Sequence, residues 1–226
     1  MPADTRDSFM LHTMLRREFA ALPDLVRAVT RGNVERAQVV ADHLEFLVGV
    51  LIGHHRAEDE RIWPALADRA GAQLDAIPET MRQQHACIEE LSDQVMTTAD
   101  GWCRDNASPA RRDMLAESLD ALVELLHEHM AMEEVTAIPL AGCHLSDAEW
   151  AEMGSYAAAG MPGGTMDLIF GMTLYEAAPQ DVTAVLSGLP PVLRAILVDE
   201  ARRVYADYAT HIHGTATPQR SRPVRS

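Results

Sequence analysis

Lysine is absent from this sequence, and all nineteen basic residues among its 226 positions are arginines. The absence excludes a lysine Schiff base and a Walker-type phosphate site as the basis of any activity. Cysteine is also scarce, because Cys87, Cys103 and Cys143 are an odd number without paired spacing. These three residues argue against a disulfide framework and against a zinc ribbon, and they fit a reducing compartment.

Long apolar runs are missing as well. No segment supplies the run of about 18 apolar residues that a membrane-spanning helix needs. The opening MPADTRDSFM lacks the basic-then-apolar order of a signal peptide. The formal net charge of −15 would repel nucleic acid and anionic membranes. We therefore predict a cytoplasmic protein with neither nucleic acid nor membrane as a main partner.

The apolar residues recur at steps of three and four, and aromatic residues make up only 5% of the chain. This periodicity predicts an all-α fold. Four long helices are expected over about 7–21, 34–63, 78–99 and 109–137. Pro23 should kink or end the first helix before a further turn to Thr30, and Pro64 should end the second. Short connections between such helices favour an antiparallel up-and-down four-helix bundle.

The character of the chain changes after Cys143. The stretch 146–149, SDAE, is a capping box that should open a further helix, and the glycines of 160–164 should then break the chain. Additional helices are expected over about 166–177, 180–186 and 191–212. We therefore divide the chain into a bundle (1–144), a helical C-terminal extension (145–213) and a small, Arg-rich tail (214–226) expected to be disordered.

The most informative feature is an internal repeat. The segment HHRAED at 54–59 is followed by Pro64, and HMAMEE at 129–134 is followed by Pro139. Both copies have a histidine, an acid four residues on, a second acid next to it, and a proline ten residues after the histidine. The chain therefore carries the same half-site twice.

The spacing within each copy places one histidine and one glutamate on the same helix face. His54 lies beside Glu58, and His129 lies beside Glu133, since residues four apart in a helix are neighbours. The apolar periodicity turns these faces inward. Buried carboxylates are costly unless they are paired or coordinate a metal, so two such faces in one bundle call for a cation.

A single histidine on each of the other two helices completes the set. His12 precedes His54 in the chain as His85 precedes His129, which gives the order H, HxxxE, H, HxxxE over four helices. Imidazole with carboxylate suits iron or manganese better than calcium or magnesium. Six ligands are too many for one structural zinc, so two metal ions bridged by two carboxylates are the economical solution.

This pattern resembles the hemerythrin-like, or HHE cation-binding, family, whose members are four-helix bundles with a di-iron site. The resemblance covers about residues 7–143, and the extension resembles that of bacterial members with additional C-terminal helices. The resemblance implies two iron ions and a set of ligands shared between them. It assigns His12 and His54 to one iron, His85 and His129 to the other, and Glu58 and Glu133 as bridges.

The sequence departs from the family pattern at one place. Invertebrate hemerythrins have a second histidine one helical turn from the third-helix histidine, whereas the flanking positions here are Met81 and Glu89. The iron held by His85 would then have an open position, a water, or another ligand such as Glu89 or a tyrosine of the extension, Tyr156 or Tyr175. An open position would favour reactivity over reversible oxygen carriage.

Several histidines compete with the chosen ligands. His55 and Asp59 have the spacing of His54 and Glu58 but lie about 100° around the helix, and the repeat favours His54. His43 could be a core histidine, an outer hydrogen-bond donor or a residue near a channel. His211 and His213 are expected in a frayed terminus, with a metal role as the alternative.

These observations lead to a functional expectation. A non-haem di-iron protein is expected to bind or reduce a small oxidant, namely O2, H2O2 or NO. One alternative is a non-catalytic sensor of oxygen, NO or iron that signals through the extension, by a protein partner or by self-association. Another is an iron storage or repair protein.

Overall fold

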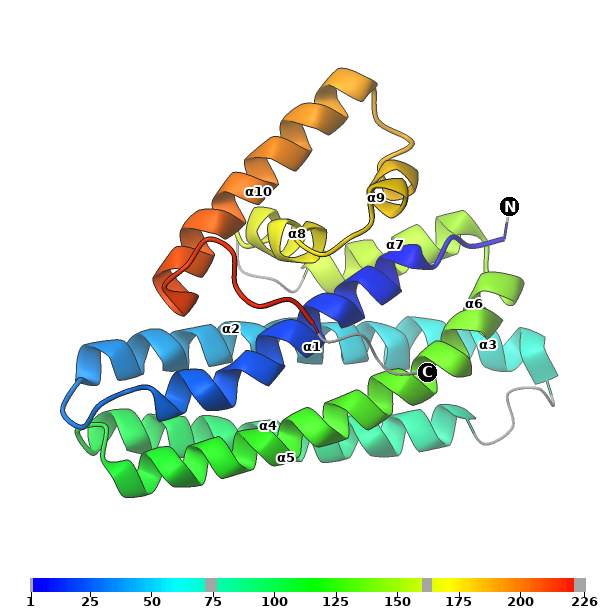
Figure 1. The fold of residues 1–226 in the computed structure, drawn as a ribbon. Helices are drawn as coiled ribbons and strands as arrows, with labels where there is room; N and C mark the ends of the chain where they lie inside the picture. The colour runs from blue at the N-terminus through cyan, green and yellow to red at the C-terminus, as the bar shows by residue number, and fades with distance from the viewer. Residues whose placement is uncertain (1, 72–76, 160–163, 222–226) are drawn as a thin grey trace.

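The computed structural model describes residues 2–71, 77–159 and 164–221, and the elements in these ranges are helices. The bundle consists of α1 (Arg6–Arg27), α2 (Val34–Ala57), α4 (Ile77–Arg104) and α5 (Pro109–Val135). Helix α1 packs against α2 and α5, and α4 packs against the same two helices, so the four enclose one core (Figure 1). The predicted all-α bundle with a helical extension is confirmed.

Two predicted helix ends in the first half of the chain were wrong. Helix α1 runs through Pro23 to Arg27 without a break. Helix α4 continues past 99 to Arg104, and the fully buried Trp102 explains why, since its burial outweighs the turn-prone sequence around it. The chain then turns at Asn106 and Ala107, which both have positive φ angles.

The second helix does not end at Pro64. Helix α2 passes into a π-helical turn, η1 (Glu58–Ile62), and then into α3 (Trp63–Ala70), which contains Pro64. The N–H of Trp63 donates to the carbonyl of Glu58, five residues back. In a regular α-helix a proline ring clashes with the carbonyl four residues earlier, and the wider π turn relieves that conflict.

The second motif copy has a corresponding break. Helix α5 ends at Val135, and α6 (Ala137–His144) follows after Thr136, whose N–H donates to the carbonyls of Met132 and Glu133. In both copies, therefore, the regular α-helix ends within two residues of the glutamate. The short helix α6 was not expected as a separate element.

The extension begins with α7 (Asp147–Ala159), and its capping box forms as predicted. The Ser146 N–H donates to Oε2 of Glu149 over 2.9 Å, and the Glu149 N–H donates back to Oγ of Ser146 over 3.4 Å. The predicted glycine break falls mostly on residues 160–163, which lie outside the described residues. The remaining helices are α8 (Met166–Leu174), α9 (Pro179–Val185) and α10 (Pro191–His213).

The extension covers one side of the bundle. Helix α7 packs on α2, and α8 packs on both α1 and α10, which places α8, α9 and α10 over α1 (Figure 1). Residues 214–221, the described part of the expected tail, lie against the bundle, where the Ser221 hydroxyl donates to the Thr13 carbonyl. Residues 222–226 of that tail are outside the described residues.

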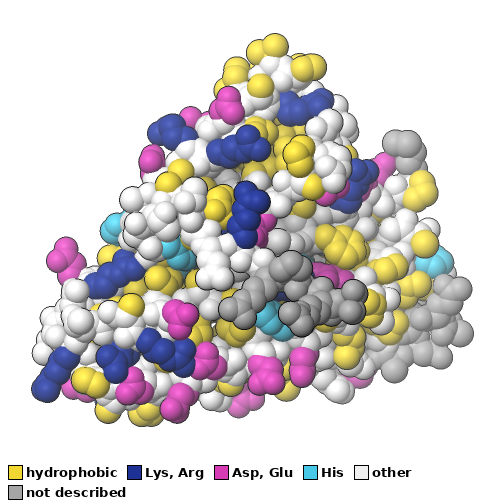
Figure 2. Space-filling model, in the orientation of Figure 1, with side chains coloured by type: hydrophobic (Ala, Val, Ile, Leu, Met, Phe, Trp, Pro, Cys, Tyr) yellow, Lys and Arg dark blue, Asp and Glu magenta, His cyan; other side chains and the backbone are white. Residues whose placement is uncertain are grey.

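Apolar residues are exposed at the free end of α10. Hydrophobic side chains gather there at the top of the molecule in Figure 2, where Val192, Leu193, Ile196 and Leu197 are each more than 40% exposed. Across the described ranges, no helix combines the length and the apolar character needed to cross a lipid bilayer.

The bundle core has two apolar clusters. The larger contains Leu15, Leu47 and Leu126, and the smaller contains Ile62 and Met81. The inward-facing histidines and glutamates of the repeat lie along the helices between these clusters. Apolar side chains therefore enclose these residues on both sides, which raises the free-energy cost of keeping them charged.

Candidate metal centre

The structure brings all six predicted ligands together inside the bundle. Each of the four bundle helices contributes at least one of them, and each of the six side chains is at most 7% exposed. The six residues are His12 on α1, His54 on α2, Glu58 at the start of η1, His85 on α4, and His129 and Glu133 on α5.

The four histidines form two pairs. The Nε2 atoms of His12 and His54 are 3.2 Å apart, and those of His85 and His129 are also 3.2 Å apart. Metal–imidazole bonds of about 2.0–2.1 Å place two ligand nitrogens of one ion roughly 3.0–3.5 Å apart. Each pair therefore has the separation expected for two ligands of one metal ion, and the pairs agree with the predicted assignment.

Glu58 extends between the two pairs. Its Oε1 lies 3.2 Å from Nε2 of His54, and its Oε2 lies 3.5 Å from Nε2 of His85. One carboxylate oxygen thus faces each pair, which is the arrangement of a bridging ligand.

Glu133 makes the corresponding contacts from the opposite helix. Its Oε2 lies 3.5 Å from Nε2 of His12 and 3.6 Å from Nε2 of His129. Both carboxylates therefore reach one histidine of each pair.

The charges in this site are not balanced by the protein. Burial, together with the neighbouring His12, lowers the pKa of His54 to about 3, and burial lowers the pKa of His129 to about 4, so these imidazoles are neutral at pH 7. Burial and the charge of Glu133 raise the pKa of Glu58 well above its ordinary value. Two carboxylates this close cannot both stay ionised among neutral imidazoles unless a cation lies between them.

Unpartnered polar atoms support the same conclusion. Oε2 of Glu58 and Oε2 of Glu133 are buried and have no hydrogen-bond partner. Leaving a buried carboxylate oxygen unpaired is costly, and a coordinated metal ion removes that cost. The donor set of imidazoles and carboxylates therefore fits metal cations of the iron and manganese type.

The second acid of each motif copy has a role that the sequence analysis missed. Oδ1 of Asp59 lies 3.1 Å from Nδ1 of His85, and Oε1 of Glu134 lies 3.1 Å from Nδ1 of His12. Each copy thus provides a carboxylate for the single histidine of a different helix. The contact of Glu134 with His12 is a hydrogen bond, which fixes that ring so that Nε2 is free for a metal. Asp59 and His85 are equally close, but these two atoms make no hydrogen bond.

His55 is the other residue that the sequence analysis undervalued. It is 4% exposed, its ring stacks on that of His85 with centroids 4.0 Å apart, and its Nδ1 has no hydrogen-bond partner. One ligand atom each from His55, Glu58, His85 and His129 lies within 4.8 Å of the others. His54 and His55 therefore both reach the site, although adjacent residues of a regular helix point about 100° apart.

The ligands suggested for an open position are located elsewhere. Glu89 is exposed on α4. The Tyr156 hydroxyl donates to Glu60 at the surface, and the Tyr175 hydroxyl donates to the Pro218 carbonyl. His55, and none of these three residues, lies next to His85 with a ligand atom near those of Glu58 and His129.

The frayed terminus predicted around His213 was wrong. Helix α10 ends against α2, where Arg36 donates to the backbone carbonyls of His211 and Ile212. These bonds satisfy carbonyl groups that are otherwise unpaired at a helix end. His213 and His43 come close to each other at this junction, away from the six ligands, with ring centroids 5.8 Å apart.

The fold and the site together define a class: a helical bundle with a buried histidine and carboxylate centre for metal cations. The model of the hemerythrin HHE cation-binding domain matches residues 10–141, which is more than half of the chain. The chain therefore belongs to the hemerythrin HHE cation-binding family. No curated protein and no solved structure matches it.

Proposed function

We propose that this chain is a non-haem di-iron protein that binds or reduces a small oxidant, O2, H2O2 or NO, in the cytoplasm. The observation that carries the proposal is the bridging position of Glu58, whose two oxygens face different histidine pairs. Glu133, which reaches both pairs, supports it. A site for a single metal ion would not need Glu58 or Glu133 to contact histidines of both pairs.

The ligand set gives each iron a defined group of donors. His12 and His54 would hold one iron, His85 and His129 the other, and both carboxylates would be shared. Two ferrous ions held in this way would supply the electrons for reducing a small oxidant. A ring nitrogen of His55 would add a donor on the side of His85, so the site next to His12 and His54 is the more open one.

The other residues would control the surroundings of the metals. Glu134 would hold the Nδ1 proton of His12 and keep that ring oriented, and Asp59 places a carboxylate beside Nδ1 of His85. The apolar clusters on both sides exclude bulk water, so uncharged small molecules would enter more readily than ions.

Metal analysis with matched variants tests the proposal. We expect about two irons per chain and the near-ultraviolet absorption of an oxo-bridged iron pair. Both should be lost in Glu58→Ala and retained in Glu128→Ala, because Glu128 is an exposed acid next to His129. A fully folded wild-type protein that takes up no iron would rule the proposal out.

The choice of oxidant is a separate measurement. The reduced protein is mixed with O2, H2O2 and NO separately and followed by stopped-flow absorption. Repeated oxidation with excess substrate indicates turnover, whereas a single stoichiometric change indicates binding alone. A reduced protein that reacts with none of the three would contradict a role in oxidant chemistry.

One observation favours a sensor as the second candidate. Arg16 lies 2.6 Å from Glu134, the carboxylate that contacts His12. Arg16 also lines a cavity of about 780 Å³ whose other walls include α5 and residues Gln219 and Ser221 of the C-terminal segment. A change at the metals could thus reach this segment through two side chains.

Hydrogen exchange distinguishes the sensor from the simple reactive centre. A sensor should show altered amide exchange in α10 and in residues 214–221 when the reduced protein is oxidised or given NO. Unchanged exchange in those segments, with a clear optical change at the metals, would remove this candidate.

A further inference from the structure

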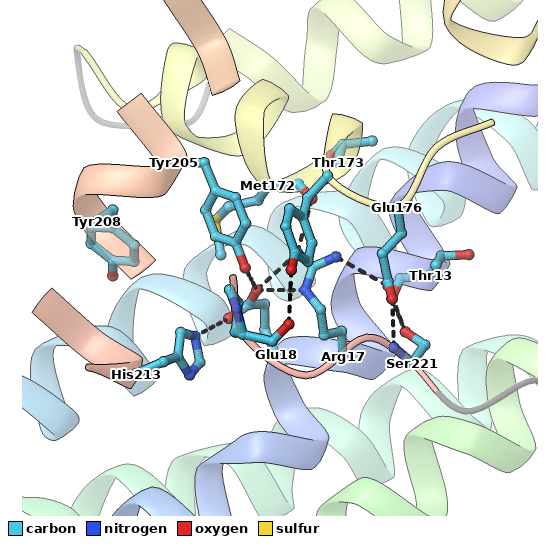
Figure 3. A network of polar contacts seen from close by, with 12 residues as sticks. Thr13, Arg17, Glu18, Met172, Thr173, Glu176, Tyr205, Tyr208, His213 and Ser221 are labelled. Atoms are coloured by element: carbon cyan, nitrogen blue, oxygen red, sulfur yellow. Dashed lines mark hydrogen bonds and ion pairs between the residues drawn. The ribbon is translucent and has the colours of Figure 1, made fainter. Parts of the chain in front are cut away.

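A second cluster of metal-binding residue types lies where the extension meets the bundle. Glu18 comes from α1, His43 from α2 and His213 from the last turn of α10. Oε2 of Glu18 lies 3.1 Å from Nε2 of His213 and 3.5 Å from Nε2 of His43. Glu18 and His43 are completely buried, and Figure 3 shows Glu18 between α1 and the helices of the extension.

The spacing of these atoms is that of a metal site. One ligand atom from each residue lies within 4.8 Å of the other two. The two separations from Glu18 fall in the same range as the histidine–glutamate separations of the bundle centre, which run from 3.2 to 3.6 Å. Bonds of about 2.0–2.1 Å to a common ion produce separations of this size.

The neighbouring side chains hold Glu18 in the orientation that a metal would need. Arg17 donates from Nε to Oε1 of Glu18 over 2.9 Å, and the Tyr205 hydroxyl donates to the same oxygen over 2.7 Å (Figure 3). Both donors use Oε1. The other oxygen, Oε2, therefore faces the two histidines, where it is hydrogen-bonded to Nε2 of His213 and leaves Nε2 of His43 unpartnered.

His43 is the observation that points to a ligand. Its Nδ1 lies 2.9 Å from the hydroxyl of Tyr208, so one ring nitrogen has a partner. Its Nε2 is buried, faces Glu18 and makes no hydrogen bond. A second group that holds Nδ1 while Nε2 stays free is the usual arrangement around a metal-bound histidine.

The local charges leave room for a cation. Arg17 is shared between Glu18 and Glu176, since its Nη1 lies 3.1 Å from Oε2 of Glu176. Two buried carboxylates therefore meet one guanidinium, and the three groups have a net charge of −1. A cation bound to the two histidines would offset this net negative charge.

From this geometry we infer a separate, mononuclear metal site formed by Glu18, His43 and His213, in addition to the centre inside the bundle. It would hold a divalent transition-metal ion of the zinc type. Two imidazoles and one carboxylate exclude calcium and magnesium, which prefer oxygen ligands. Three protein ligands are the number found in zinc sites that keep a position for water. Because His213 belongs to α10, the ion joins the extension to the bundle.

Cobalt titration of the full-length, iron-loaded protein tests this site without depending on any variant. Co²⁺ is the probe because its visible absorption reports the coordination by nitrogen and oxygen ligands. We expect one equivalent of Co²⁺ to bind with the iron content unchanged. A folded, iron-loaded wild-type protein that binds no Co²⁺ overturns the inference.

Two variants at the end of α10 locate the ion. His213→Ala should bind one metal ion fewer than the wild type, and His211→Ala should bind as many, since His211 is exposed two residues away. If the bundle centre takes up no iron, Co²⁺ fills both sites and the difference of one ion between the two variants still holds. Equal Co²⁺ binding by both variants also overturns the inference.

Discussion

Asp59 Oδ1 lies 3.1 Å from Nδ1 of His85, so the acid next to Glu58 contacts a histidine on another helix. Glu134 lies equally close to Nδ1 of His12 and is hydrogen-bonded to it. Each copy of the sequence repeat thus supplies a candidate ligand and, next to it, an acid that contacts a histidine of another helix. Each half of the bundle helps to orient a histidine of the helix beside it.

The first prediction concerns these supporting acids. Asp59→Asn and Glu134→Gln should each weaken metal binding by about 10- to 100-fold, because a neutral amide removes the carboxylate charge that makes the neighbouring imidazole a stronger metal ligand. Competition with a chelator of known affinity measures the change. The control is Glu60→Gln, an exposed acid of the same π turn. Wild-type affinity in both variants would show that these contacts do not support the site.

The second prediction concerns His55. His55→Ala should retain both metals but bind the ion next to His85 roughly tenfold more weakly, a change of about 1.4 kcal/mol. It should also bind azide more tightly, because a coordination position is opened. Metal titration and azide absorption measure the two effects. An unchanged affinity for both would mean that His55 only packs against His85.

The third prediction concerns Arg17, whose side chain is almost fully buried between two carboxylates. Arg17→Met leaves Glu18 and Glu176 without their guanidinium and should lower the free energy of unfolding by about 3–5 kcal/mol. Arg27→Met, on the same helix, removes an exposed ion pair with Asp120 and should cost at most about 1 kcal/mol. Denaturant unfolding of both variants gives the comparison. Similar losses of unfolding free energy in both variants would mean that the buried ion pairs of Arg17 do not help to hold the extension on the bundle.

The fourth prediction concerns the contact between α8 and α10. A Cβ atom at Gly171 would lie 2.1 Å from the Ala201 carbonyl oxygen, so Gly171→Ala must separate the two helices. We expect a loss of about 1–3 kcal/mol. Gly154→Ala in α7 meets no atom within 4 Å and should instead stabilise the protein by about 0.5–1 kcal/mol. Thermal unfolding decides between these opposite signs, and a neutral Gly171→Ala would contradict the packing.

The fifth prediction concerns pH. The hydrogen bond from Arg69 lowers the pKa of Glu149 from its ordinary value of 4.5 to about 2. Because the folded pKa is the lower one, the stabilisation is complete above pH 4.5 and is lost as the pH falls towards 2. The difference in melting temperature between wild type and Glu149→Gln should therefore shrink from pH 7 to pH 3. A difference that stays constant would contradict this linkage.

The sequence by itself determined what lies within one helix. The positions of His54 and Glu58, or of His129 and Glu133, follow from the repeat of the α-helix, so their common face could be predicted before any packing was known. The capping box of Ser146 and Glu149 is equally local, and it forms as expected. Local sequence did not decide every helix end, because the helices run through Pro23 and Pro64.

Only the tertiary structure decided which groups from different helices meet. The continuation of the helical chain from α2 into α3, past Pro64, depends on the π turn η1, and a helical repeat of 3.6 residues does not predict such a turn. The pairing of Asp59 with His85, and of Glu18 with His43 and His213, joins residues far apart in the chain. Those distances are set by how the helices pack, and the spacing along one helix contains no information about the approach of another.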